Sequence, residues 1–190
     1  MKFSFKWILI GLVAVFVLYL GGTYNALIGQ KGMVEGSWAQ VQNVYQSRFD
    51  LVPNLQAIVK GAANFEQETL IGVTEARTKW MNASSEGNRE EQVAAANQFD
   101  SALSRLLVTV ESYPQLTATQ GFLTFQAQLE GIENRVRVAR MDYKSTVTKY
   151  NIFVQQFPRM ILANLFGFEP EPFFKAVDQA QTAPQINFGE

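Results

Sequence analysis

The side chains that could do chemistry in this chain are carboxylates, lysines, tyrosines and serines, because its 190 residues include neither histidine nor cysteine. Their absence excludes disulfides, Cys–His zinc sites, cysteine nucleophiles, Ser-His-Asp triads and imidazole acid–base catalysis. No P-loop, dinucleotide-binding or nucleophile-elbow motif occurs. We therefore expect no catalytic residue, no cofactor-binding residue, no metal ligand and no cofactor, and predict that the chain is not an enzyme.

The carboxylates form close groups at Glu66-x-Glu68, Glu90-Glu91 and Glu130-x-x-Glu133. Di-iron four-helix bundles need a Glu-x-x-His on each of two helices, which this chain lacks. No EF-hand spacing occurs, although an all-carboxylate calcium or magnesium cluster stays open as an alternative. The favoured interpretation is a solvated helix face on which Glu133 and Arg137 are spaced for an i,i+4 ion pair.

Arg48, Asp50 and Asn54 form a second polar group. Arg48 falls on an apolar stripe of a predicted helix, where an unpaired charge would be costly. It should therefore have a carboxylate partner on a neighbouring helix. The candidates are Glu66, Glu111 and Glu130. The group is interpreted as a buried structural network, with a ligand site as the alternative.

The N-terminus is apolar. Trp7 to Gln30 carries no charge, and as a helix these residues would extend about 36 Å, enough for a hydrocarbon core of about 30 Å. A cleavable signal peptide is the alternative, but no A-x-A site follows the apolar run. We predict an uncleaved single-pass anchor that contacts the lipid bilayer through residues 7–28.

Spacings of three and four dominate from Met33 onward and predict long amphipathic helices. The first carries Val34, Trp38, Val41 and Tyr45 and continues to Ala62, with a kink or break near Asp50–Pro53. The others are expected at about 65–81, 89–112 and 122–157, with Thr117 or Thr119 as the last N-cap. No alternating pattern predicts a strand, so the fold class is all-α.

The C-terminal part is less regular. A short apolar helix after Pro158 is expected to fold back and cap the bundle, and some of Phe166, Phe168, Phe173 and Phe174 could be exposed for partner or membrane contact. The predicted organisation is a tail and transmembrane helix over 1–30, a helical bundle over 31–178 and a flexible tail over 179–190.

The net charge of −1 predicts no strong field that would attract nucleic acid, so no nucleic-acid partner is expected. Lys2 and Lys6 are the only charged residues among the first 30. The body, residues 31–190, therefore carries 14 basic and 17 acidic side chains.

Ordered motifs along the chain resemble the LemA family. They include Tyr24-Asn25-x-Leu27, Trp38-x-Gln40-Val41, Arg48-x-Asp50-Leu51-x-Pro53-Asn54-Leu55, Phe125-Gln126-x-x-Leu129-Glu130-Gly131-x-Glu133-Asn134-Arg135, Tyr150-Asn151 and Leu165-Phe166-Gly167-Phe168. The resemblance covers roughly residues 24–174. It departs from the family at Ile132, where Thr is usual, and at Lys144, where Asn often follows the Tyr.

This resemblance implies a protein of the bacterial inner membrane with one N-terminal span, an antiparallel four-helix bundle and no established enzymatic activity. It also implies a cytoplasmic bundle, whereas the N-terminal lysines lean weakly toward the opposite orientation. We expect a membrane-tethered scaffold or interaction protein that forms a homo-oligomer or docks a partner membrane protein. A ligand-sensing bundle that binds a small molecule between helices is the alternative.

Overall fold

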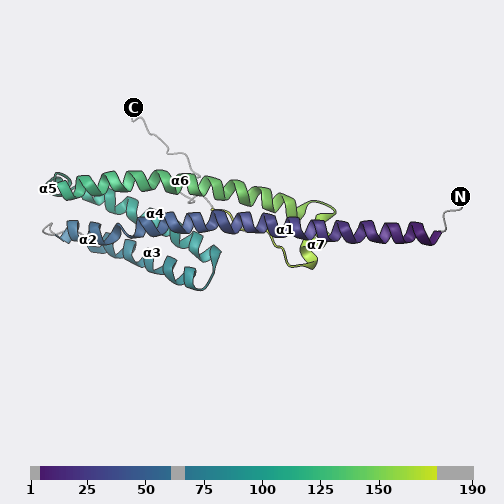
Figure 1. Ribbon diagram of the computed structural model, residues 1–190. Helices are drawn as coiled ribbons and strands as arrows, with labels where there is room; N and C mark the ends of the chain where they lie inside the picture. The colour runs from purple at the N-terminus through teal and green to yellow at the C-terminus, as the bar shows by residue number, and fades with distance from the viewer. Residues whose placement is uncertain (1–4, 61–66, 175–190) are drawn as a thin grey trace, which may run out of the picture. The chain divides into compact units, whose positions relative to one another are not determined.

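The computed structural model describes residues 5–60 and 67–174, and these residues form helices and connecting turns with no strand (Figure 1). The all-α class predicted from the sequence is therefore confirmed for this part of the chain. The helices are α1 (Phe5–Phe49), α2 (Val52–Lys60), α3 (Gln67–Ser85), α4 (Arg89–Glu111), α5 (Pro114–Thr117), α6 (Gln120–Gln155) and α7 (Arg159–Leu165).

The expected break near Pro53 is present between α1 and α2. Helix α1 ends at Phe49 and α2 begins at Val52, which places Pro53 in the first turn of α2. A proline is tolerated there because the first amide groups of a helix have no intrahelical acceptor. The predicted apolar stripe is buried on both sides of the break. Its buried members are Val34, Trp38, Val41, Tyr45, Val52, Leu55 and Val59. Ala62 lies outside the described residues.

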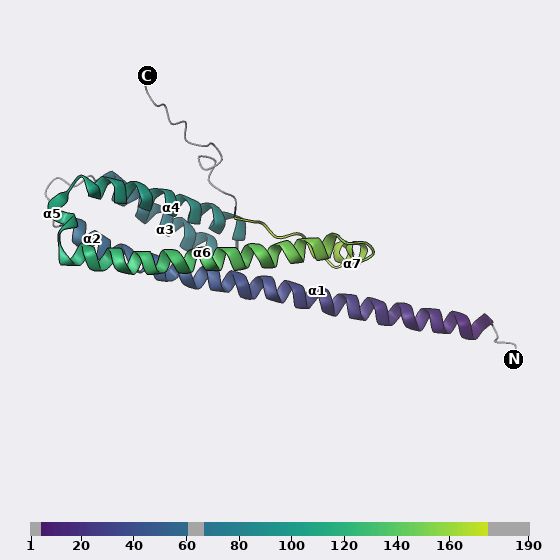
Figure 2. The same cartoon turned by 90° about the horizontal axis from the view of Figure 1, so that it is seen from above.

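The described residues divide into two compact units, and α1 and α6 contribute to both. The first unit contains α1 up to Val41, α6 from Ala139 onward and the chain as far as Glu171. Its core includes Leu27, Val34, Tyr143 and Tyr150, and the rings of Trp38 and Tyr143 are 5.0 Å apart. The N-terminal end of α1, purple in Figures 1 and 2, has no other described element beside it.

Among the described residues, the second unit contains those within Gln42–Val138 and residues 172–174. Helices α3 and α4 pack along each other as a hairpin (Figure 2). Gly87, with φ +70°, makes the turn between them, and Asn88 caps α4 by accepting a hydrogen bond from the Glu91 amide. An aromatic cluster fills the core of this unit. It consists of Tyr45, Phe49, Trp80 and Phe99.

Helix α6 begins at the residue after Thr119, whose hydroxyl accepts a hydrogen bond from the Phe122 amide at 3.2 Å. Of the two expected caps, Thr119 is thus the one used. The helix ends at Gln155, and Phe157 is 79% exposed. The helix expected over about 122–157 therefore ends two residues earlier than predicted, and Phe157 lies beyond it.

Helix α1 passes the predicted domain boundary at residue 30 without interruption. This boundary stays a prediction, and so does the end of the bundle at residue 178. The predicted flexible tail, residues 179–190, lies outside the described residues.

Candidate functional site

Arg48 lies in the last turn of α1, and its side chain is 5% exposed. The helical spacing that buries Val41 and Tyr45 on α1 also directs Arg48 toward the core. A cation in the last turn interacts favourably with the partial negative charge of the helix C-terminus. That interaction is small, however, so burial of Arg48 requires carboxylate partners.

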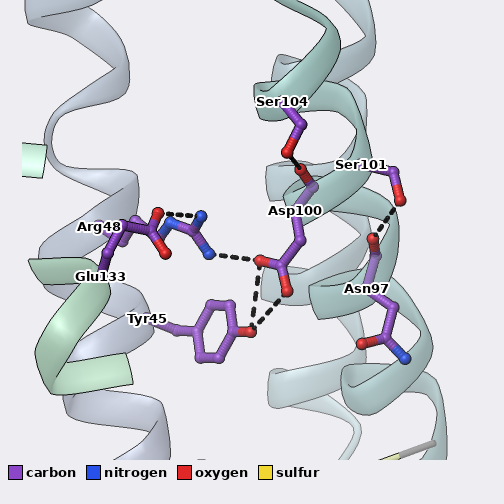
Figure 3. Close-up of polar contacts among 7 residues, drawn as sticks. All are labelled: Tyr45, Arg48, Asn97, Asp100, Ser101, Ser104 and Glu133. Atoms are coloured by element: carbon purple, nitrogen blue, oxygen red, sulfur yellow. Dashed lines mark hydrogen bonds and ion pairs between the residues drawn. The ribbon is translucent and has the colours of Figure 1, made fainter. Parts of the chain in front are cut away.

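The guanidinium of Arg48 binds two carboxylates that come from two different helices (Figure 3). Nη1 donates to Asp100 Oδ1 on α4, and Nη2 donates to Glu133 Oε1 on α6. The Asp100 side chain is mostly buried, whereas that of Glu133 is 44% exposed. The planar fork of arginine can serve two acceptors in different directions, which a lysine ammonium at the end of a flexible stem does less well.

Tyr45 and Phe99 complete the surroundings of this ion cluster. The Tyr45 hydroxyl donates to both oxygens of Asp100, at 3.4 and 3.3 Å. Arg48 Cζ lies 5.3 Å from the centroid of the Phe99 ring and 6.0 Å from that of Tyr45, which is within cation–π range. Arg48 Nε has no hydrogen-bond partner among the described residues. We name these four residues, Tyr45, Arg48, Asp100 and Glu133, the arginine cluster.

The chemistry of the arginine cluster is that of a fixed ion network. An arginine stays protonated in proteins, so it offers no proton for acid–base transfer. Its charge occupies the position between Asp100 and Glu133 that a metal cation would need. The cluster joins α1, α4 and α6 within the second unit, and buried networks of this kind are known to specify one arrangement of helices.

Two of the three expected partners of Arg48 were wrong, and the third is not tested. Glu111 and Glu130 are exposed and do not bind it, and Glu66 lies outside the described residues. The signal that could have identified the true partners is helical spacing. Asp100 lies four residues after buried Ala96 and three before buried Leu103, and Glu133 stands in the same relation to Leu129 and Val136.

Asp50 and Asn54 do not join the arginine cluster. Asp50 is exposed and accepts a hydrogen bond from the Gln46 side chain at 2.9 Å. Asn54 is also exposed and lines a recess of about 370 Å³ between α2 and the start of α6. The structure therefore separates the three residues that the sequence grouped.

The expected Glu133–Arg137 pair does not form. Glu133 binds Arg48, and Arg137 donates to the side-chain oxygen of Asn134 at 2.6 Å. Among the described residues, no group of three or more carboxylates is arranged to hold a metal ion.

A second polar cluster, which sequence reasoning missed, lies in the first unit around Lys31. Lys31 Nζ donates to Glu171 Oε1, lies 3.7 Å from Glu35 Oε1 and is 5.7 Å from the centroid of the Tyr150 ring. Asn151 exchanges two hydrogen bonds with the backbone of Glu171. The Tyr150-Asn151 pair was visible in the sequence, but nothing there indicated its partner.

Tyr150 is fully buried, and its hydroxyl has no hydrogen-bond partner in the part of the chain that the structure describes. Burial raises the pKa of the Tyr150 phenol above its ordinary value, and the negative charges of Glu171, Glu35 and Glu169 raise it further. The phenol therefore stays neutral well into the alkaline range.

These features define an all-helical protein class with one N-terminal helix that is long and apolar enough to cross a membrane. A sequence model of the LemA family matches residues 37–188, and the chain belongs to this family.

Relatives at low identity support this assignment. The chain is 24% identical to protein LemA of Metamycoplasma hominis over 82% of its own length and 70% of the relative. It is also 24% identical to magnetosome protein MamQ 2 of Paramagnetospirillum magneticum, over 92% of this chain and 74% of that protein. Magnetosome protein MamQ of Magnetospirillum gryphiswaldense is 28% identical over 50% of this chain and 36% of its own length.

Proposed function

We propose that this protein is a membrane-tethered scaffold without catalytic activity, which self-associates or docks other membrane proteins. In this proposal, residues 7–28 cross the bacterial inner membrane once, and the helices that follow form an antiparallel four-helix bundle. The single observation that carries the proposal is the continuity of α1, because one unbroken helix contains both the apolar N-terminal residues and Arg48.

The apolar part of α1 supports tethering. Its large side chains from Phe5 to Leu18 are exposed, and the most apolar window of the helix has no buried residue. Exposed apolar surface costs about 25 cal/mol per Å² in water, so this face needs an apolar environment. The 45 residues of α1 correspond to about 68 Å of helix, which exceeds the roughly 30 Å of a hydrocarbon core.

The arginine cluster supports a structural rather than a catalytic role. Its two carboxylates are engaged by a permanent cation, and an acid–base pair would instead need groups that can exchange a proton. The names of the relatives, protein LemA and magnetosome protein MamQ, specify no reaction. We place the bundle on the cytoplasmic side, as the family resemblance implies.

Cross-linking of native membranes with a lysine-reactive reagent, followed by mass spectrometry, tests the scaffold proposal. We expect cross-links between copies of this chain, or to one defined membrane protein. Recovery of monomer alone would contradict it. Protease protection of intact cells, monitored at a C-terminal tag, establishes the side of the membrane.

A matched pair of variants tests the tether separately. Val17→Arg places a charge in the predicted span, where insertion should become less favourable by about 2.5–3.5 kcal/mol. Val108→Arg makes the same change at a similarly exposed position on α4. We expect only Val17→Arg to reduce the membrane-bound fraction after alkaline extraction. Equal behaviour of the two variants would argue against anchoring by α1.

One observation favours ligand sensing as a second candidate. The recess beside Asn54 has a volume within the range of small-molecule sites, and Gln120, Thr124 and Gln128 give it further polar groups. A thermal-shift screen with metabolites and divalent ions distinguishes the two functions. A stabilising compound whose effect is lost in Asn54→Ala, but kept in the exposed control Asn82→Ala, would favour sensing over scaffolding.

A further inference from the structure

We infer that residues 157–168, which comprise α7 and its flanking residues, form a second lipid contact in the interfacial layer of the bilayer that α1 crosses. We call these residues the α7 segment. This inference rests on the proposed anchoring by α1, and it adds a monotopic element that the single-span description lacks.

The exposed face of the α7 segment is mostly apolar. Leu162 and Ala163 are buried, whereas Phe157, Ile161, Leu165 and Phe166 are exposed, Leu165 by 72%; Asn164 is the exposed polar residue among them. A surface helix in water normally presents polar residues on the side opposite its buried face. Helix α7 instead has apolar residues on both sides, which is the pattern of a helix whose outer face contacts a nonpolar phase.

The sequence around α7 has the distribution of charged and apolar residues that is typical of a helix at a membrane interface. Between Arg159 and Glu169 the chain has no charged residue. Arg159, at the start of α7, stacks on the Phe153 ring at 4.3 Å from the centroid. Interfacial helices characteristically combine a basic residue at headgroup level with Phe and Leu that enter the acyl boundary.

The length of α1 that is exposed without interruption is shorter than a hydrocarbon core. Along α1, Phe5 to Tyr19 are exposed, but Thr23 is 7% exposed and Leu27 is completely buried by the protein. This uninterrupted exposed stretch of 15 residues gives about 22 Å of helix, less than the roughly 30 Å of a hydrocarbon core. The part of the first unit that covers Thr23 and Leu27 must therefore enter the membrane boundary together with them.

Two aromatic contacts place the α7 segment beside this part of α1. The ring of Tyr24 lies 4.9 Å from that of Phe166 and 6.1 Å from that of Phe168, both edge-on. When the uncharged run Trp7 to Gln30 is centred on the hydrocarbon core, Tyr24 lies roughly 7 Å inside its edge. Monotopic helices bury their apolar face about 5–10 Å into this boundary. The depth of Tyr24, and of the Phe166 ring beside it, falls within this range.

Site-directed spin labelling of the full-length chain tests the inference, and the absence of native cysteine means that each label has a single site. The single-cysteine variants are Ile161→Cys and Leu165→Cys in α7, Val17→Cys in the span and Val108→Cys on α4. All four positions are exposed, so the labels should not disturb packing, and circular dichroism checks the fold. The labelled proteins are reconstituted in vesicles of equal parts phosphatidylcholine and phosphatidylglycerol.

The measurement is the ratio of label accessibility to oxygen, which partitions into lipid, and to a water-soluble nickel chelate. We expect a several-fold higher ratio at positions 161 and 165 than at 108, and the highest ratio at 17. A high ratio at 17 with values at 161 and 165 equal to that at 108 would overturn the inference and leave the anchor intact. A low ratio at 17 would overturn both the anchor and this inference.

A protein partner on the same face gives a third, distinguishable result. Labels at 161 and 165 would then be shielded from both reagents and would show restricted motion, and this outcome also overturns the lipid assignment.

Discussion

Asn151 on α6 and Glu171 beyond α7 exchange two hydrogen bonds. The Asn151 amide donates to the Glu171 carbonyl at 3.0 Å, and the Glu171 backbone amide donates to the Asn151 side-chain oxygen at 2.8 Å. Glu171 lies outside any helix, so its backbone amide and carbonyl do not obtain hydrogen bonds from regular secondary structure. The Asn151 side chain supplies both of these bonds. Together with the bond from Lys31 to the Glu171 carboxylate, it fixes the chain after α7 within the first unit.

Asn151→Ala should release this segment. Removing a side chain that satisfies two backbone groups is expected to cost about 1–2 kcal/mol locally. Hydrogen-exchange mass spectrometry should show faster exchange over residues 166–174, with little change in α4. The exposed Asn82→Ala is the control. Unchanged protection in Asn151→Ala would mean that the two bonds do not hold the segment.

Arg48→Ala should be strongly destabilising, by about 3 kcal/mol, because the buried Asp100 loses its counter-ion and a cavity remains. Arg48→Lys retains the charge but cannot reach both carboxylates as a fork, and should lose about 2 kcal/mol. Urea unfolding monitored by circular dichroism provides the measurement. The control is Arg137→Ala, whose exposed side chain bonds only Asn134 and should have little effect. Full stability of Arg48→Lys would refute the role assigned to the fork.

Tyr150 should make the protein sensitive to alkaline pH. Because the folded-state pKa is raised above the ordinary 10.0, the folded protein retains a proton that the unfolded chain releases. The associated stability is complete below pH 10.0 and decreases as the pH rises from there toward the folded-state pKa. Unfolding midpoints measured across this range should fall less steeply in Tyr150→Phe than in the parent chain.

The same substitution should be nearly neutral at pH 7, because the hydroxyl that it removes is buried and has no hydrogen-bond partner within residues 5–60 and 67–174. Glu35→Gln should lower the pKa of Tyr150 toward its ordinary value, since it removes one of the negative charges that raise it. Ultraviolet difference absorption of tyrosinate follows this change directly. A loss of about 1 kcal/mol or more in Tyr150→Phe at neutral pH would reveal a hydrogen bond to this hydroxyl.

Thr119→Ala should destabilise the start of α6 by about 1 kcal/mol, because the Phe122 amide loses its acceptor. Thr117→Ala, two residues earlier, should have a smaller effect, since the Thr117 hydroxyl bonds only the Pro114 carbonyl within α5. Thermal unfolding of the two variants compares them. An equal loss in both would show that the capping bond does not determine where α6 begins.

The helices could be predicted from the sequence because each one repeats the same spacing many times. The expected stretch 89–112 corresponds to α4 at Arg89–Glu111, and Pro53 and Thr119 signal a break and a cap through local chemistry. Such signals depend on residues only a few positions apart, so they do not require knowledge of the tertiary structure.

The partners of Arg48 could not be selected in this way. They depend on how far α4 and α6 are shifted along α1, and a shift of about one turn in α6 would bring Glu130 toward the same point in place of Glu133. Glu130 and Glu133 are only three residues apart, yet one is exposed and the other binds Arg48. The spacing of Asp100 and Glu133 within apolar stripes reduces the number of candidate partners. The axial shift of the helices then determines which of these carboxylates bind Arg48.

The order of synthesis gives the arginine cluster a further significance. Arg48 is separated from Asp100 by 52 residues and from Glu133 by 85. A ribosome therefore delivers the cation long before its second counter-ion, and a nascent chain that ends in α4 holds an incompletely neutralised guanidinium. The second unit can close around Arg48 only after the first half of α6 has emerged, so a prematurely terminated product remains open and accessible to quality-control proteases.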